Sequence, residues 1–222
     1  MPTRRIFLAA TAASAAVGST SLFDGETTRS WRAVGGGEFP SSSWTVSDGC
    51  LKATVSKPTF QDLRTVDEFE DFDLEFEWKI APDGNSGVKY LLYREDVWKP
   101  AGSLASHARG RGFEYQISDG ISARKPTEAS GGIYEFIAPS ETQARPAGEF
   151  NSGRIVRRGS AVEHWLNGVR VVEVRLDTPE MQARMRARKV PTELPRKTAI
   201  VLQNHASEAW FRRLRIQALG RV

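Results

Sequence analysis

Residues 72–80 alternate strictly between apolar and charged side chains, and this pattern constrains the fold more than any other stretch of the chain. The apolar positions are Phe72, Leu74, Phe76, Trp78 and Ile80, and an acidic or basic residue stands between each pair. Because successive side chains of a strand point to opposite faces, a period of two predicts a β-strand with one buried face. Turn residues at 82–85 end this strand.

Two dipeptides predict tight β-hairpins elsewhere in the chain. Asp48-Gly49 separates the apolar segments 44–46 and 50–55, and Asn167-Gly168 separates His164-Trp165-Leu166 from Val169-Arg170-Val171. Asp-Gly and Asn-Gly are the preferred central residues of two-residue hairpin turns, since both tolerate the left-handed backbone that these turns require.

The remaining strand and helix signals predict the fold class. Further strands are expected at residues 88–93, 113–118, 153–157, 161–174, 198–203 and 210–217, with a loop at 94–112. One helix is expected at about 178–188, where Thr178 is a plausible N-cap and Pro179 suits the first helical position. Many short strands and a single helix predict an all-β sandwich of two antiparallel sheets, in which one sheet curves to form a groove.

Composition narrows the range of functions. The chain has 222 residues with 40% hydrophobic and 26% charged residues, which suits one large β domain without a bias toward disorder. A net charge of +4, without a basic stripe interleaved with aromatics, argues against nucleic-acid binding. The single cysteine, Cys50, excludes an internal disulfide.

The N-terminus predicts export. Arg4-Arg5 directly precedes Ile6-Phe7-Leu8 and an Ala-rich apolar run, and small residues at 13–15 offer a cleavage site. We interpret residues 1–19 as a twin-arginine-type signal and residues 20–222 as the mature domain, located in the periplasm or secreted. The alternative is an ordinary helical start. The apolar run is too short to span a bilayer.

Polar side chains line one face of the strands expected within residues 83–134. Asn85 and Lys89 alternate with apolar residues in one stretch, and Glu114 and Gln116 alternate with Phe113 and Tyr115 in another. Such a face is either solvated surface or the floor of a sugar-binding cleft, and alternation alone does not distinguish these alternatives.

Seven segments together resemble a known family. They are Asn85-Ser86-Gly87-Val88-Lys89-Tyr90, Glu114-Tyr115-Gln116-Ile117, Gly131-Gly132-Ile133-Tyr134, Pro146-Ala147-Gly148-Glu149-Phe150-Asn151, His164-Trp165-Leu166-Asn167-Gly168, Leu202-Gln203-Asn204-His205 and Trp210-Phe211-Arg212-Arg213-Leu214-Arg215-Ile216. In this order, within residues 23–219, they are similar to the 3-keto-disaccharide hydrolases. The resemblance implies a concanavalin A-like jelly-roll sandwich that acts on glycosides whose sugar is oxidised at carbon 3. It also implies export and a functional partnership with a sugar 3-dehydrogenase.

The chain departs from the family pattern at two points. Relatives commonly carry an acidic and His-containing stretch after the Glu-Tyr-Gln strand, whereas residues 118–122 here contain no His. Near the C-terminus, Gln203-Asn204-His205-Ala206 replaces the common Gln-Asp-His-Gly. Both changes remove potential metal ligands, so a divalent metal is left open and no cofactor is assigned.

The implied chemistry assigns roles to individual residues. A keto group at carbon 3 acidifies the hydrogen on carbon 2, so a base can remove it and the resulting enediolate expels the group at carbon 1. Glu114 is the expected base, with Lys89 and His205 as its electrophilic or acid partners. The expected substrate-binding residues are Asn85, Gln116, Asp119, His164 and Gln203.

Other interpretations stay open at this point. His164 faces the same way as Val162 and Leu166, which also fits a buried structural histidine. His107 falls in the expected loop and is given no role. A two-carboxylate glycosidase would pair Glu114 with Asp119 or Glu128. A carbohydrate-binding module of the same fold, without catalysis, is the alternative function.

Overall fold

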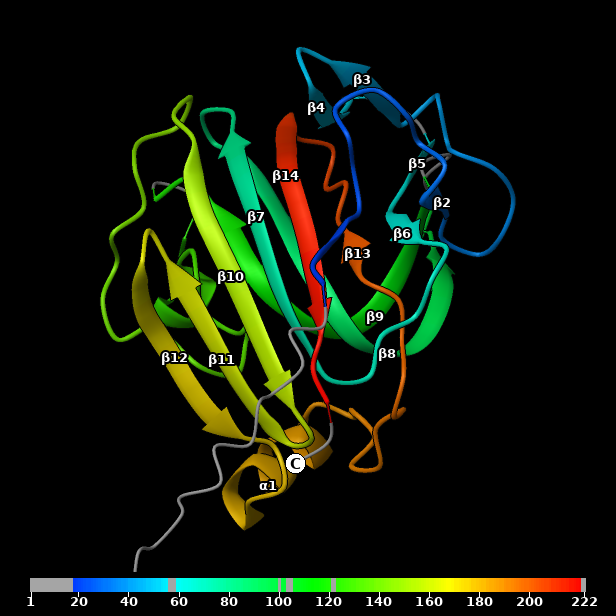
Figure 1. Cartoon of the computed structure of the whole chain (residues 1–222). Helices are drawn as coiled ribbons and strands as arrows, with labels where there is room; N and C mark the ends of the chain where they lie inside the picture. The colour runs from blue at the N-terminus through cyan, green and yellow to red at the C-terminus, as the bar shows by residue number, and fades with distance from the viewer. Residues whose placement is uncertain (1–17, 56–58, 100, 103–105, 121–122, 221–222) are drawn as a thin grey trace, which may run out of the picture.

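The structure is a computed structural model that describes residues 18–55, 59–99, 101–102, 106–120 and 123–220. The expected export signal lies almost entirely outside these residues. The described chain forms two β-sheets that pack face to face, which confirms the all-β jelly-roll sandwich (Figure 1). No helix in the described part of the chain is long and apolar enough to cross a membrane.

The eight-stranded sheet has the order β12-β11-β10-β7-β14-β4-β3, and β1 also pairs with β14. Its strands are β1 (Thr20–Ser21), β3 (Trp44–Ser47), β4 (Cys50–Ala53), β7 (Phe72–Ile80), β10 (Asn151–Arg158), β11 (Ala161–Leu166), β12 (Val169–Arg175) and β14 (Ala209–Ala218). All of its strand pairs are antiparallel.

The six-stranded sheet has the order β2-β6-β13-β8-β9-β5. Its strands are β2 (Trp31–Ala33), β5 (Thr59–Gln61), β6 (Leu63–Thr65), β8 (Asn85–Trp98), β9 (Ser106–Ser118) and β13 (Val201–Leu202). The pairing of β5 with β9 is parallel, so the expectation of purely antiparallel sheets is wrong at this edge. The strand expected at residues 198–203 is confined to the two residues of β13.

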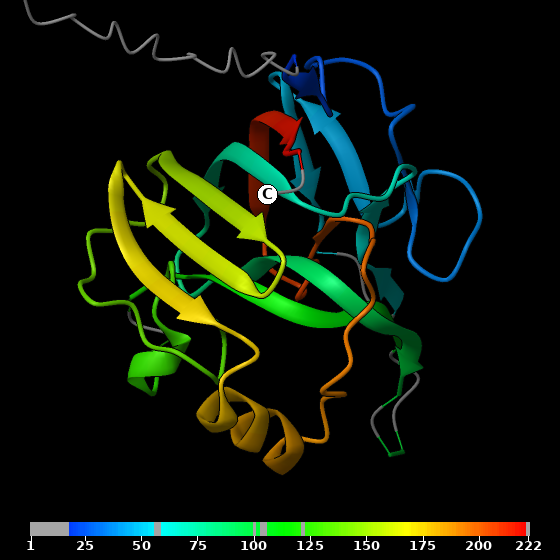
Figure 2. The same ribbon diagram turned by 60° about the horizontal axis from the view of Figure 1, so that its bottom comes forward.

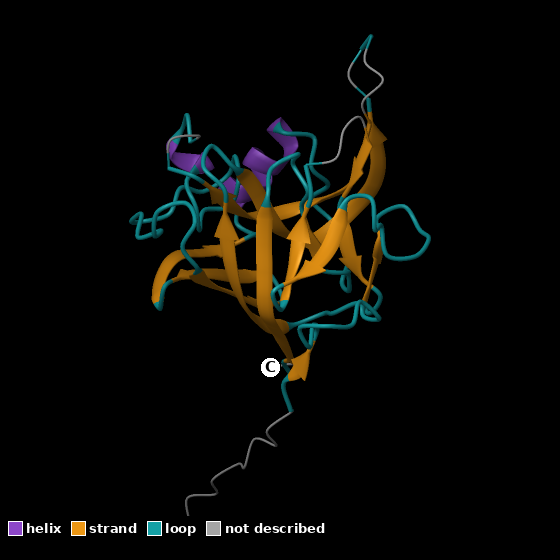
Figure 3. Cartoon of the chain, turned by 90° about the horizontal axis from the view of Figure 1, so that it is seen from above, coloured by secondary structure: helices purple, strands orange, loops and turns teal. Residues whose placement is uncertain are grey.

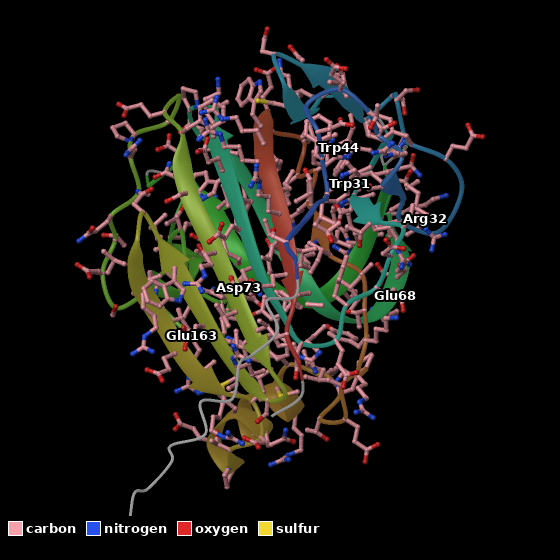
Figure 4. All side chains as sticks on the ribbon, viewed as in Figure 1. Trp31, Arg32, Trp44, Glu68, Asp73 and Glu163 are labelled. Atoms are coloured by element: carbon pink, nitrogen blue, oxygen red, sulfur yellow. The ribbon has the colours of Figure 1, made fainter. Side chains whose placement is uncertain are left out.

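The strand expected at residues 72–80 is confirmed as β7, whose alternate apolar residues are buried. They pack in the core against inward-facing residues of the other sheet, including Val88, Tyr90, Phe113 and Tyr115. Two tryptophans help to close the sandwich near its N-terminal strands (Figure 4). The indole of Trp31 donates to the Leu22 carbonyl and that of Trp44 to the Gln61 carbonyl, both at 2.8 Å.

The local signals for turns and for the helix are confirmed. Asp48, Gly49, Asn167 and Gly168 all have positive φ angles, as two-residue hairpin turns of this kind require. The helix α1 (Pro179–Ala187) begins after Thr178, whose hydroxyl accepts from the Met181 amide. A short 3₁₀ helix, η1 (Pro126–Glu128), is the other helical segment described, and both segments lie outside the strand layers (Figure 3).

Strands β8 and β9 form a long hairpin, so the loop expected at residues 94–112 is wrong for most of its length. Residues 94–98 pair with residues 107–111 across the two strands. Asp96 stabilises this pairing, because its carboxylate accepts from the guanidinium groups of Arg109 and Arg111 on the facing strand. An irregularity between Tyr90 and Arg94 bends the ribbon, which Figure 2 shows as a curved band.

The six-stranded sheet also curls along its width. Strands β5 and β6 are separated in the chain by Asp62 alone, yet β5 is the edge neighbour of β9 and β6 lies beyond β13. A connection of one residue can join them only if the sheet curls toward itself. Asp62 therefore sits inside this curl, where its backbone amide donates to Ala108 and its carbonyl accepts from Val34.

Candidate functional site

A cleft of about 590 Å³ lies on the face of the six-stranded sheet that points away from the sandwich core. Side chains alternate between the two faces of β9. Phe113 and Tyr115 point into the core, so Glu114 and Gln116 point into the cleft. Its floor is formed by β8 and β9. Its walls come from the segment after η1, the end of α1 and the segment after β13, with Tyr134, Glu135, Phe136, Arg188, Gln203 and His205 among the lining residues.

A buried ion pair lies beneath the cleft. The Lys89 ammonium is 2.9 Å from Oδ2 of Asp62, and these residues are 4% and 0% exposed. Oδ1 of Asp62 is 2.7 Å from Nε2 of His107 and accepts from the Asn204 amide at 3.0 Å. Every polar atom of this carboxylate is thus engaged, which a buried charge requires.

The contacts of Asp62 keep it ionised. Burial alone would raise the pKa of Asp62, but the Lys89 ammonium and the hydrogen bond with His107 outweigh burial and hold this pKa below its ordinary value. The ionised carboxylate in turn fixes Lys89 in place at the bottom of the cleft.

Glu114 is the carboxylate that faces Lys89 from β9. The two residues are directly paired across β8 and β9, and Nζ of Lys89 lies 4.0 Å from Oε2 of Glu114. Burial raises the pKa of Glu114 to about 7, because the loss of solvation outweighs the opposing effect of Lys89, and the charges of Asp62 and Glu135 act in the same direction as burial. A carboxyl group with this pKa serves as a base near neutral pH.

Gly87 makes room for the Glu114 side chain. A Cβ atom at position 87 would overlap the Glu114 carboxylate, so only glycine lets that carboxylate lie against the β8 backbone. The backbone of Gly87 has no positive φ angle, so close approach rather than turn geometry explains this residue.

Gln203 and His205 border the Lys89–Glu114 pair. In the amide orientation that suits both neighbours, Gln203 donates to Oε1 of Glu114 at 3.2 Å and accepts from Lys89 at 3.1 Å. His205 is exposed at the cleft, and partial desolvation lowers the pKa of its imidazole, with His107 and Lys89 acting in the same direction. It is therefore neutral near pH 7.

Asn85 and Gln116 form an amide pair at one end of the cleft. The Gln116 amide donates to Oδ1 of Asn85 at 3.1 Å, and both residues line the cleft. Gln116 is only 1% exposed, and its Oε1 atom is buried without a hydrogen-bond partner. An unpaired buried acceptor is costly, so a hydroxyl group of a bound ligand would satisfy it.

The structure thus brings together six of the eight residues predicted as site residues, namely Glu114, His205, Lys89, Asn85, Gln116 and Gln203. The other two lie elsewhere. His164 is fully buried between the sheets, where its ring contacts the Tyr90 hydroxyl and the Gly131 carbonyl, each at 2.9 Å. Burial lowers the pKa of His164 to about 4, so this histidine is a neutral core residue and the prediction that it binds substrate is corrected.

Asp119 also lies outside the cleft lining. Its carboxylate accepts from the Asp83 amide at 2.9 Å and so stabilises the turn between β7 and β8. Glu128 is likewise absent from the lining, and its carboxylate accepts from the Arg124 amide. The second carboxylate of the cleft is Glu135, which the two-carboxylate alternative did not consider.

The sequence did not reveal three residues that line or support the cleft: Asp62, His107 and Tyr134. His107 was expected in a loop, but it lies in strand β9. Asp62 stands between two strands of three residues each, with no local pattern that marks it as buried. Tyr134 donates its backbone amide to the Glu114 carbonyl at 3.0 Å, which places it beside the base.

The donors of this cleft do not suit a divalent metal. Within the described residues, no group of three or more His, Cys, Asp or Glu side chains is placed to hold a metal ion. The Lys89 ammonium lies between the two nearest carboxylates, and the Asp62 oxygens are already engaged. The divalent metal left open by the sequence therefore does not fit this set of residues.

A second hollow, of about 660 Å³, lies on the outer face of the eight-stranded sheet. Three of its charged side chains belong to ion pairs on that face: Arg154 pairs with Asp73 at 2.5 Å, and Arg213 pairs with Glu77 at 2.8 Å. Asp73 and Glu163 mark this face in Figure 4. Paired charges on a solvated sheet are ordinary surface, so this hollow is not the candidate site.

Comparisons with known proteins agree with the fold. A 3-keto-disaccharide hydrolase of Bacteroides thetaiotaomicron is 29% identical over 236 aligned positions, which cover 91% of this chain and 79% of that protein. A Parabacteroides distasonis protein, provisionally named a glycosyl hydrolase, has a solved structure with a TM-score of 0.76 and 25% identity. The match covers 95% of this chain and 98% of that one.

A more distant structural relative is a β-glucanase of Bacillus licheniformis. It has a TM-score of 0.52 at 11% identity, over 91% of this chain and 99% of the glucanase, and so supports the fold alone. Residues 18–217 match the family described as the 3-keto-alpha-glucoside-1,2-lyase-like domain. This match spans most of the chain, and the chain therefore belongs to the 3-keto-alpha-glucoside-1,2-lyase-like family.

Proposed function

We propose that the protein is a glycoside-cleaving enzyme that acts on 3-keto-glycosides by elimination and hydration. The family and the name of the Bacteroides relative support glycoside cleavage, and the cleft supports this particular reaction. The observation that carries the proposal is Glu114, a carboxyl group with a pKa near 7 that lies 4.0 Å from a fixed ammonium.

The proposed first step is proton abstraction. The ionised Glu114 carboxylate takes the proton from carbon 2, and the electron pair of that bond forms a double bond between carbons 2 and 3. Negative charge then develops on the former keto oxygen, where the Lys89 ammonium stabilises it. Carbon 2 and the oxygen on carbon 3 are close neighbours in the sugar, so a base and a cation 4.0 Å apart can address both.

The second step breaks the glycosidic bond. The electron pair returns from the oxygen on carbon 3 to re-form the ketone, the double bond moves between carbons 1 and 2, and the bond from carbon 1 to the leaving oxygen breaks. The departing oxygen takes up the proton that Glu114 removed from carbon 2, which returns Glu114 to its ionised form. Water then adds across the double bond, with its hydroxyl group on carbon 1 and its proton on carbon 2, and the net reaction is hydrolysis.

The reaction needs a substrate that is already oxidised at carbon 3. We therefore propose that a sugar 3-dehydrogenase acts before this enzyme. Export to the periplasm or out of the cell, inferred from Arg4-Arg5 and the following apolar run, is also a proposal.

The direct test incubates the purified protein with 4-nitrophenyl 3-keto-glucoside and follows release of nitrophenol. We expect release by the wild-type protein and none from the same glucoside without the keto group, because its hydrogen on carbon 2 is not acidic. Glu114→Gln should remove turnover and remain folded. Glu163→Gln, on the outer face of the other sheet, is the matched control and should retain full activity.

A carbohydrate-binding module of the same fold predicts a different result. Such a module would bind the keto-glycoside without releasing nitrophenol, and Glu114→Gln would then change only affinity. A binding module has no need for a carboxyl group whose pKa lies near 7, so the Glu114 environment favours the enzyme.

A further inference from the structure

The β8–β9 ribbon presents two chemically different ends to the cleft, with the Lys89–Glu114 pair between them. On one side of this pair, Gly87 faces Gln116 and Asn85 faces Ser118. On the other side, beyond the irregularity at residues 90–94, Trp98 faces His107 near the tip of the ribbon. The ribbon thus offers amides at one end and aromatic rings at the other.

The aromatic end is a row of three rings across three strands, which we call the aromatic shelf: Phe60, His107 and Trp98. Phe60 pairs with His107 across β5 and β9, and His107 pairs with Trp98 across β9 and β8. Directly paired residues point to the same face of a sheet, and all three residues line the cleft. The Phe60 and His107 ring centroids are 4.5 Å apart with an interplanar angle of 34°.

Trp98 leaves much of its apolar surface uncovered. It is 45% exposed, and it is the one aromatic residue among the large exposed hydrophobic side chains of the described chain. The Arg109 guanidinium lies 5.3 Å from its ring centroid, which holds the indole at the cleft wall. An exposed tryptophan in a cleft offers a flat surface on which another ring can stack.

The amide end has the opposite character. The unpaired Oε1 atom of Gln116 requires a hydrogen-bond donor, and Asn85 lies beside it. A sugar bears several hydroxyl groups and meets that requirement, whereas a flat apolar ring does not. The oxidised sugar therefore suits the amide end, and the leaving group then extends toward the aromatic shelf.

We propose that the aromatic shelf is the leaving-group subsite, so that the protein prefers 3-keto-glycosides whose leaving group carries a ring. This inference rests on the proposed function and names its substrate class: an aryl or a glycosyl group stacks on Trp98 and Phe60 while the keto sugar binds at Asn85 and Gln116. The His107 ring is part of the shelf, and its Nε2 atom forms a hydrogen bond with Asp62. Because Asp62 also fixes Lys89, the subsite is in contact with the residues that support catalysis.

The test compares methyl, phenyl and glucosyl 3-keto-α-glucosides with the wild-type protein and Trp98→Ala. For each substrate, the ratio of kcat/KM between variant and wild type cancels the intrinsic reactivity of the leaving group. We expect about a tenfold loss for the ring-bearing substrates, the size of one stacking contact plus its buried area, and no loss for the methyl glycoside. Trp98→Tyr should recover most of the activity.

Two further variants serve as controls. Trp210→Ala removes a tryptophan that also lies beside cations, Lys52 and Lys79, but belongs to the other sheet, and it should affect no substrate. Gln116→Leu should reduce kcat/KM by a similar factor for all three substrates, because the keto sugar is common to them. Circular dichroism checks that each variant is folded.

The outcomes separate the inference from the proposed function. If Trp98→Ala reduces kcat/KM for the phenyl glycoside alone, the subsite binds an aryl leaving group. If it does so for the glucosyl glycoside alone, the subsite binds a sugar. A reduction for both substrates means that the subsite accepts a ring of either kind. Equal effects of Trp98→Ala on all three substrates, or no effect on any, would overturn the subsite while leaving catalysis established. If no keto-glycoside is cleaved, calorimetric Kd values decide: phenyl and methyl keto-glucosides must differ in affinity, and Trp98→Ala must abolish that difference.

Discussion

Replacement of Glu114 by Gln tests the raised pKa through catalysis and stability at once. In the wild-type protein only the ionised carboxylate is a base, so turnover must increase as pH rises through the pKa of about 7. At pH 5 about one hundredth of the molecules carry the ionised form, and at pH 7 about half do. We therefore expect kcat/KM to increase about a hundredfold from pH 5 to a plateau above pH 8, with its midpoint near 7.

The same pKa predicts a change in stability. The folded protein holds the Glu114 proton more tightly than the unfolded chain, since the pKa rises from its ordinary value of 4.5 to about 7. The resulting stabilisation is fully present below pH 4.5 and is lost as pH rises through 7. At 1.36 kcal/mol for each pH unit, this loss amounts to about 3 kcal/mol.

The wild-type protein must be compared with Glu114→Gln because His164 changes the stability with pH in the opposite direction. Its pKa falls from 6.5 to about 4, so the unfolded chain binds the proton more tightly and stability is lost as pH decreases through that range. Both proteins contain His164, and subtraction removes its contribution. The unfolding free energy of Glu114→Gln minus that of the wild type should increase by about 3 kcal/mol between pH 4 and pH 8.

The assay is urea unfolding at half-unit intervals of pH, with the kinetics measured in the same buffers. A difference in unfolding free energy that does not change with pH would refute the raised pKa of Glu114. Wild-type turnover that is constant from pH 5 to pH 9 would remove Glu114 as the base even if the stability result held.

Three other substitutions test the surroundings of the base. Asp62→Asn leaves the buried Lys89 ammonium without its ionic partner and should lower the free energy of unfolding by about 3 kcal/mol or more. The same substitution removes a charge that raises the pKa of Glu114, so the midpoint of the pH–rate profile should move to lower pH. Gly87→Ala should displace the Glu114 carboxylate and reduce kcat about a hundredfold with little change in urea midpoint, while Gly120→Ala, which meets no neighbouring atom, should be neutral for both. His164→Phe removes two buried hydrogen bonds and should lower the free energy of unfolding by about 2 kcal/mol without a change in KM, and a large increase in KM would show that this histidine acts at the site.

The features predictable from the sequence are those set by neighbouring residues. The alternation of β7, the Asp48-Gly49 and Asn167-Gly168 turns and the Thr178 cap each depend on fewer than a dozen consecutive positions, and all were found as predicted. The resemblance to a known family added the cleft residues of β8 and β9, whose polar faces alternation alone left ambiguous.

The outer half of the β8–β9 ribbon was not predictable in this way. Residues 94–112 are rich in Arg and Gly and lack a regular apolar face, so their sequence is typical of a loop. They form strands because Asp96 pairs with Arg109 and Arg111 across the hairpin, an arrangement that depends on register rather than on composition. His107 was missed as a consequence.

Asp62 was missed for a different reason. Its partners Lys89 and His107 lie 27 and 45 residues further along the chain, and only the curl of the six-stranded sheet brings them together. Nothing in the residues around position 62 indicates a buried carboxylate, because acidic residues between short strands are ordinarily exposed.

The position of Asp62 explains how a carboxyl group beside an ammonium can have a pKa near 7. An ammonium 4.0 Å away normally lowers the pKa of a carboxyl group. Here the Lys89 ammonium lies closer to Asp62, at 2.9 Å, and the charge of Asp62 acts on Glu114 in the opposite direction, so burial determines the result. A chain with Lys89 and Glu114 but without an acid at position 62 would therefore hold a simple ion pair in its cleft, whereas this arrangement keeps a base and a fixed cation side by side.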